Sequence, residues 1–174
     1  MGWIVNYSSG FHVHVSKQGL ENKQGQKDFN FNVIFFKLWY AFEPLFCSYL
    51  QKGRVQNLYA NLYQQFYTLK EVLSDKFVKK ELEGLTSGMK GKPFELSKSV
   101  GVQRVNDKVN VDHPRYFCIN YTTLNKDSIG TIEVRMKEST LDSEEIQYWV
   151  LLFQNLFMFA HHLYTNYTYK KALR

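Results

Sequence analysis

The sequence predicts a single α+β domain, in which an antiparallel sheet carries helices packed on one of its faces. Side chains of alternating polarity occupy residues 11–16 and 131–136, as in strands that bury one face. Between and after these segments, apolar residues recur at every third or fourth position, as in amphipathic helices. Of the 174 residues 44% are hydrophobic and 17% aromatic, which predicts a substantial core. Residues 1–174 therefore fit one domain, without internal repeats.

The first two elements are a strand and a helix. In the strand, Phe11, Val13 and Val15 point to one face, and the polar residues alternating with them point to the other. The apolar stretch 33–46 then predicts a buried helix, bent or broken near Pro44. Lys37, Glu43 and Pro44 interrupt it well short of the roughly 20 residues that a membrane span needs, so no membrane span is expected.

A second helix is predicted from Val55 to about Leu82, where leucine, phenylalanine and valine residues recur at helical spacing. The segment 84–93 breaks this pattern with three glycines and a proline. It does not match a P-loop, because Thr86 stands where the first glycine belongs and Pro93 where Ser or Thr belongs. We interpret it as a surface loop.

The last part of the chain predicts an antiparallel meander and a helix. Strand-like runs lie at 109–111, 116–122 and 131–136, with turns at 113–114 and 126–130. Asp142 is the expected cap of the final helix, with Glu145 at the capping-box position and His161 and His162 at its end. One face of that helix should pack across the sheet and is formed by Ile146, Trp149, Val150, Phe153, Leu156, Phe157 and Ala160.

The net charge and the two cysteines limit the ligands and the cellular compartment that fit this chain. The net charge of +6 admits anionic ligands, but the lysines are dispersed and no nucleic-acid-binding motif accompanies them. Cys47 and Cys118 lie in apolar surroundings, which fits buried thiols in a reducing, cytoplasmic compartment. Glycosylation triplets begin at Asn6, Asn120 and Asn166, but no signal peptide precedes them, and we interpret them as accidental.

The chemistry-bearing residues lie on the two alternating strands. His12, His14 and Ser16 share one face of the first, and Glu133 and Arg135 share one face of the later strand. Imidazoles, a carboxylate and a guanidinium on neighbouring strands can hold a divalent cation and the phosphates attached to it, as an ATP site requires. The alternatives are a hydrogen-bonded surface pair of histidines and a Glu133–Arg135 pair that only joins strands.

Four segments in this order, 10–15, 115–120, 131–135 and 139–142, resemble the amidoligase family. In this sequence they read Gly-Phe-His-Val-His-Val, Arg-Tyr-Phe-Cys-Ile-Asn, Thr-Ile-Glu-Val-Arg and Ser-Thr-Leu-Asp. The family consists of carboxylate–amine ligases with a glutamine-synthetase-like fold. The resemblance extends from Ser9 to about Ala160 and is weakest between Lys76 and Asp107.

The resemblance implies an ATP- and Mg²⁺-dependent ligase that forms amide bonds through an acyl phosphate, from a carboxylate and an amine that are peptides or small molecules. By this likeness His12 and Glu133 are metal ligands, and Arg135, with Glu133, acts on the transferring phosphoryl group. His14, Ser16, Arg115 and Asn120 would hold the nucleotide or substrate oxygens. Two of these residues also have a purely structural interpretation: Asn120 can stabilise a turn, and Arg115 can pair with Asp112.

Family members also carry an earlier strand with an alternating Glu-x-Glu pair, whereas this chain begins eleven residues before His12. The resemblance is therefore to the C-terminal portion of the family domain. We expect a fragment, a homo-oligomer or partner chain that completes the sheet near residues 1–15, or a catalytically inactive interaction or structural subunit. A metal-dependent hydrolase is the remaining alternative, because two histidines and a glutamate also suit zinc.

Overall fold

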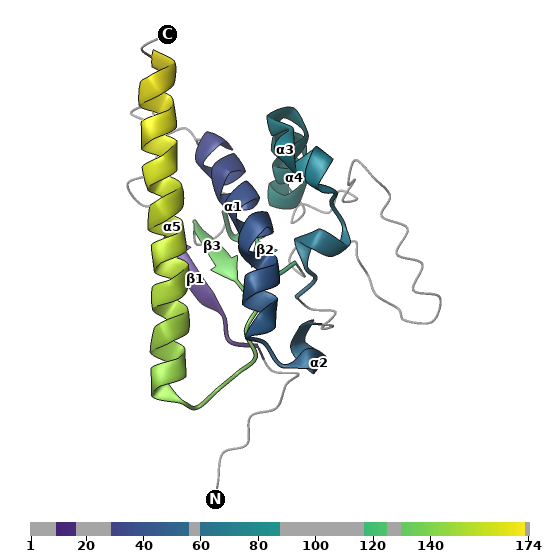
Figure 1. Ribbon diagram of the computed structural model, residues 1–174, viewed down its shortest axis with the longest axis vertical. Helices are drawn as coiled ribbons and strands as arrows, with labels where there is room; N and C mark the ends of the chain where they lie inside the picture. The colour runs from purple at the N-terminus through teal and green to yellow at the C-terminus, as the bar shows by residue number, and fades with distance from the viewer. Residues whose placement is uncertain (1–9, 17–28, 56–59, 88–116, 125–129, 173–174) are drawn as a thin grey trace, which may run out of the picture.

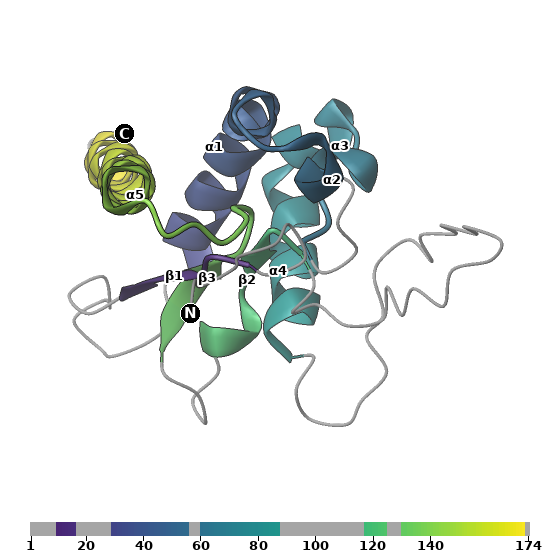
Figure 2. The ribbon, with the colours of Figure 1, turned by 90° about the horizontal axis from the view of Figure 1, so that it is seen from below.

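The computed structural model describes residues 10–16, 29–55, 60–87, 117–124 and 130–172. These residues form a mixed α+β structure with a three-stranded antiparallel sheet (Figure 1). The long helices α1 (Phe29–Ser48) and α5 (Ser143–Ala172) contact each other and lie on the same side of the strands (Figure 2). The predicted α+β class, with helices on one face of an antiparallel sheet, is confirmed.

The sheet has the strand order β1-β3-β2, so that β3 (Thr131–Val134) lies between β1 (Val13–Ser16) and β2 (Ile119–Asn120). Both pairings are antiparallel, with Val13 and Ile119 opposite Val134 on its two sides. The strand following β2 is thus its antiparallel neighbour, as predicted. The observed β2 is shorter than the expected strand 116–122, and residues 109–116 lie outside the described residues.

Aromatic side chains from α1 and α5 fill the space above the sheet. Phe31 lies 4.8 Å from Phe157, and Trp39 lies 5.8 Å from Phe153, measured between ring centroids. The inward residues of the sheet, Ile119, Ile132 and Val134, are fully or almost fully buried beneath them. The apolar half of the strand alternation therefore forms the floor of the core.

Of the bend or break expected near Pro44, the break does not occur, because helix α1 continues through Pro44 to Ser48. A proline inside a helix removes the hydrogen bond to the carbonyl four residues earlier, here that of Tyr40. The side-chain amide of Gln64 donates to this carbonyl at 2.9 Å. The carbonyl that Pro44 leaves without its helical donor is therefore satisfied from another element.

The carboxylate of Glu43, 1% exposed, joins α1 to the 3₁₀ helix η1 (Tyr63–Gln65) and to the chain before β2. Its oxygens accept the backbone N–H groups of Tyr63 (2.9 Å) and Gln64 (2.7 Å). The Trp39 indole and the Cys118 thiol donate to it as well, each at 3.2 Å. Desolvation by burial raises the pKa of Glu43, although these hydrogen bonds act in the opposite direction.

The single helix predicted from Val55 to about Leu82 is wrong. The described residues of this region form α2 (Lys52–Val55), η1, α3 (Leu69–Leu73) and α4 (Asp75–Ser87), and residues 56–59 lie outside them. Thr68 begins α3 with a capping box to Glu71, and the Ser74 hydroxyl accepts the N–H of Phe77 at the start of α4. These local caps interrupt a pattern that is otherwise helical.

Two further boundaries differ from the prediction. Helix α4 passes through Gly84 to Ser87, and residues 88–93 of the expected loop lie outside the described residues. Helix α5 does not end at His161 and His162 but continues to Ala172. Among the described residues, no helix combines the length and apolar character needed to cross a membrane.

The start of α5 is fixed to the end of the sheet. Asp142 caps it as predicted, accepting the N–H groups of Glu144 (2.9 Å) and Glu145 (3.2 Å). The Glu145 carboxylate pairs with the buried Lys137 ammonium (2.8 Å), which also pairs with Glu138. On the helix, Val150 is 37% exposed, so the prediction that it lines the buried face is wrong.

Both cysteines are free thiols. Burial, followed by the nearby charge of Glu43, raises the pKa of the Cys47 thiol to about 11, and burial raises that of Cys118 well above its usual range. Cys118 is a buried thiol as predicted, whereas Cys47 is only partly buried.

We predict that Glu43→Ala lowers the free energy of unfolding by on the order of 3 kcal/mol, because two backbone N–H groups and an indole N–H lose their acceptor inside the core. Urea unfolding followed by circular dichroism measures the change. Glu83→Ala, which removes an exposed glutamate from α4, is the matched control and should stay within about 0.5 kcal/mol of the wild type. Equal losses in both variants would contradict this role of Glu43.

Candidate functional site

The polar half of the strand alternation lies on the sheet face opposite the core. His12, His14 and Ser16 are exposed, whereas Phe11, Val13 and Val15 between them are half-buried and pack against the core. On β3, Glu133 lies between the inward residues Ile132 and Val134 and therefore points to the same face as the histidines. The prediction that His12 and His14 share a face with Glu133 is confirmed.

The register of the sheet places His14, Glu133 and Asn120 in one row across the three strands. The Nδ1 atom of His12 lies 2.9 Å from Oε1 of Glu133, and Nε2 of His14 lies 3.8 Å from the same oxygen. The Asn120 amide donates to Oε2 at 2.6 Å. Segments separated by more than a hundred residues thus converge on one carboxylate, as the sequence predicted.

The orientation of the Asn120 amide is set by Thr122. Both the backbone N–H and the hydroxyl of Thr122 donate to Oδ1 of Asn120, at 2.9 and 2.7 Å. With its oxygen occupied in this way, Asn120 presents its NH₂ group to Glu133. Asn120 therefore stabilises a turn, which was the structural alternative to a binding role, and it contacts the Glu133 carboxylate at the same time.

The role of Thr122 was missed from the sequence. The signal is the Asn-x-Thr spacing at residues 120–122, which also reads as a glycosylation triplet. Asn120 and Thr122 are 4% and 2% exposed and hydrogen-bond each other, so this triplet is part of the interior. Thr131 was missed as well: its hydroxyl lies 2.9 Å from Nδ1 of His14.

The Glu133 carboxylate is ionised at neutral pH. Burial is the largest single effect on it and raises its pKa, but hydrogen bonds from His12 and Asn120 and the charge of Arg135 outweigh burial. Together they lower the pKa of Glu133 to about 2. The face thus holds a fixed negative charge with cationic or neutral donors around it.

Of the three remaining predicted site residues, the structure describes Arg135 and Ser16 but not Arg115. The Arg135 side chain is buried, with the residue 8% exposed. The backbone N–H of Arg135 donates to the Cys118 carbonyl at 2.8 Å, and this bond continues the sheet beyond β3. Ser16 lies at the far end of β1 opposite Thr131, two positions along the strand from His14. Arg115 lies outside the described residues.

The fit of a cation can be judged from these distances. Ligands about 2.1 Å from an octahedral ion and at right angles to each other are about 3 Å apart. The 2.9 Å between Nδ1 of His12 and Oε1 of Glu133 matches such a pair, provided that the cation replaces the proton between them. Among the described residues, no group of three or more His, Cys, Asp or Glu side chains could hold a metal ion. The described residues therefore offer two ligands here, and phosphate oxygens and water would supply the others.

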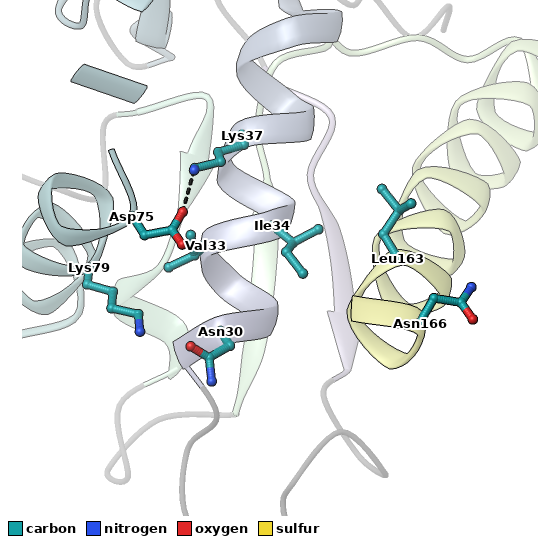
Figure 3. A pocket seen from close by; sticks show the side chains of 8 residues that line it. All are labelled: Asn30, Val33, Ile34, Lys37, Asp75, Lys79, Leu163 and Asn166. Carbon is teal, nitrogen blue, oxygen red and sulfur yellow. Dashed lines mark hydrogen bonds and ion pairs between the residues drawn. The ribbon is translucent and has the colours of Figure 1, made fainter. Parts of the chain in front are cut away.

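A separate cavity of about 550 Å³ lies on the helix side, between α1, α4 and α5. Figure 3 shows its lining, with Ile34 of α1 directed toward Leu163 of α5 and Val33 of α1 directed toward Asp75 of α4. Its clearest charged feature is the Lys37–Asp75 ion pair, in which Lys37 also donates to the Leu73 carbonyl at 2.9 Å. Among the predicted site residues that the structure describes, none lines this cavity, and its ion pair joins α1 to the start of α4.

Comparison of the chain with protein-family models, with curated proteins and with solved structures finds no match.

We predict that Glu133→Gln destabilises the fold in a pH-dependent way. A folded-state pKa of about 2 against an ordinary value of 4.5 stabilises the fold fully above about pH 4.5, and this contribution is lost as the pH falls towards 2. The shift corresponds to on the order of 3 kcal/mol at neutral pH.

Unfolding in urea at pH 7 and pH 3 measures this contribution. The difference between Glu133→Gln and wild type should be large at pH 7 and shrink at pH 3, while the exposed Glu83→Gln should show little difference at either pH. A deficit that does not change with pH would show that packing, not charge, stabilises this position.

Proposed function

We propose that the sheet face around Glu133 is the cation- and phosphate-binding part of a carboxylate–amine ligase site of the glutamine-synthetase-like, amidoligase type. The observation that carries the proposal is the row of His14, Glu133 and Asn120 across β1, β3 and β2. Three of the four segments that resemble the family contribute side chains to this row or its neighbours. Unrelated surface residues would not be expected to converge in this way.

Each described residue has a role that fits its position, and Arg115, which lies outside the described residues, takes its role from the family resemblance alone. Glu133 and His12 would hold Mg²⁺ through Oε1 and Nδ1, and Arg135 would face the phosphoryl group whose charge it can offset. Asn120, fixed by Thr122, keeps Oε2 of Glu133 in place so that Oε1 remains directed at the histidines. His14 and Ser16, exposed along β1, would contact the nucleotide, and Arg115 would hold substrate oxygens.

The charge of the site supports a cation more than a bare anion. An ionised carboxylate at the centre of the face repels phosphate unless a cation lies between them. Mg²⁺ commonly binds through one or two protein groups together with phosphate oxygens and water. When bound, ATP would supply the phosphoryl group that activates a carboxylate for attack by an amine.

The second candidate is an inactive ligase-like interaction subunit. Both oxygens of Glu133 are already hydrogen-bonded within the chain, by His12 and Asn120, which favours a structural role. In the described part of the sheet β1 pairs only with β3, so its other edge can accept a partner strand, whether from a second copy or another chain. The hydrolase alternative has less support, because a zinc site needs three protein ligands and the described residues provide no such group.

We predict that Mg²⁺ with ATP raises the thermal midpoint of the wild-type protein by a few degrees at ligand concentrations well above Kd. Mn²⁺ should act at least as well, because imidazole nitrogen binds it more readily than Mg²⁺.

Glu133→Gln and His12→Ala should abolish the increase. Glu43→Gln is the control for lost stability, because it alters a buried glutamate on the helix side and should keep the increase. The absence of any nucleotide or cation effect at millimolar concentrations would contradict the ligase proposal and favour the interaction subunit.

A further inference from the structure

Helix α5 exposes an apolar stripe on the side that does not face the core. Its members are 38–69% exposed, although each is a large hydrophobic residue. We call them the outer stripe: Tyr148, Leu151, Leu152, Met158 and Phe159. The opposite side of the helix, with Trp149, Phe153 and Phe157, is buried against α1 and the sheet.

The helix is thus apolar on two opposite sides. From Gln147 to Asn166 it contains no Asp, Glu, Lys or Arg, which is unusual for a helix at the edge of a domain (Figure 1). A helix that is hydrophobic all round is normally buried all round. Exposed side chains of this kind mark an interaction surface.

The outer stripe is symmetric about Asn155. Tyr148 lies seven residues before Asn155 and His162 seven residues after it. Leu151 and Leu152 precede it by four and three residues, and Met158 and Phe159 follow it by three and four. Every one of these offsets returns to the same side of a helix with 3.6 residues per turn.

We propose that the outer stripe binds the same stripe of a second copy of this chain, with the two α5 helices antiparallel about a two-fold axis at Asn155. In this arrangement Leu151 and Leu152 meet Phe159 and Met158 of the partner, and each contact occurs twice, as in isologous dimers. Tyr148 meets the partner's His162. This proposal does not depend on the proposed ligase function.

Asn155 is the reason to prefer a second copy over another occupant. A lone amide at the centre of an apolar surface costs free energy when it is buried without a partner. On the two-fold axis each Asn155 amide meets its own copy, and two amides can donate to and accept from each other. A lipid surface offers no such partner at that depth.

The size of the stripe fits a weak dimer. A fully buried aromatic side chain covers roughly 150–250 Å², so half-exposed ones offer on the order of 100 Å² each. The stripes of two copies together then bury about 1,000 Å², near the lower limit of specific interfaces. We therefore expect a dimer that dissociates on dilution.

Sedimentation velocity of the full chain, from low to high micromolar concentration, tests the proposal. Wild type should shift from monomer to dimer as concentration rises. Leu151→Glu and Met158→Glu should weaken dimerisation by at least about tenfold, since they bury unpaired charge at the seam. Gln154→Glu adds the same charge beside the stripe on the same helix and should weaken it far less. Circular dichroism checks that each variant is folded.

A cysteine placed on the axis tests the geometry. Asn155→Cys should form a disulfide-linked dimer under mild oxidation, while Gln154→Cys and the wild type, with its own Cys47 and Cys118, should not. A wild type that stays monomeric, or equal effects of Leu151→Glu and Gln154→Glu, would overturn the proposal. So would flotation of monomeric protein with phosphatidylcholine–phosphatidylserine vesicles, which would assign the stripe to a lipid surface.

Discussion

The position of β3 between β1 and β2 is the constraint on which both the core and the candidate site depend. Ile132 and Val134 must face α1 and α5 to complete the core, and the period of two along a strand then forces Glu133 to the other face. A slip of one residue would place the carboxylate in the core and an isoleucine on the open face. Apolar packing on one side therefore fixes the polar geometry on the other.

Two buried glutamates show how the same side chain is used differently. Glu43 accepts two backbone N–H groups and holds η1 against α1, but burial dominates and raises its pKa. Glu133 is also buried, at 7% exposed, yet hydrogen-bond donors and the nearby charge of Arg135 outweigh burial and lower its pKa to about 2. Ionisation of Glu43 therefore lowers the free energy of unfolding as the pH rises from about 4.5 towards its raised pKa. Protonation of Glu133 lowers the free energy of unfolding as the pH falls from about 4.5 towards 2. The difference leaves Glu133, and not Glu43, as the ionised carboxylate on which the proposed cation site rests.

The sequence predicted the features that follow from local periodicity. It did not predict the features that depend on contacts between distant residues or on hydrogen bonds within a single turn. Alternation along each strand, together with burial of the apolar residues on one face, places His12 and His14 on the face of Glu133. The helix predicted from Val55 to Leu82 is not continuous, because the side chains of Thr68 and Ser74 accept backbone N–H groups and start new helices there. The continuation of α1 through Pro44 depends on Gln64, whose contact with Tyr40 no pattern within α1 reveals.

The two oxygens of Glu133 differ in a way that bears on how a cation would enter. Oε2 is held by Asn120, which is buried and itself fixed by Thr122, so releasing it would leave several polar groups without partners. Oε1 is held by His12, whose side chain is 36% exposed. In the proposed site a cation would take the place of the hydrogen between Nδ1 of His12 and Oε1 of Glu133. The proposed cation would therefore enter at Oε1, while Asn120 and Thr122 keep the rest of the row in place.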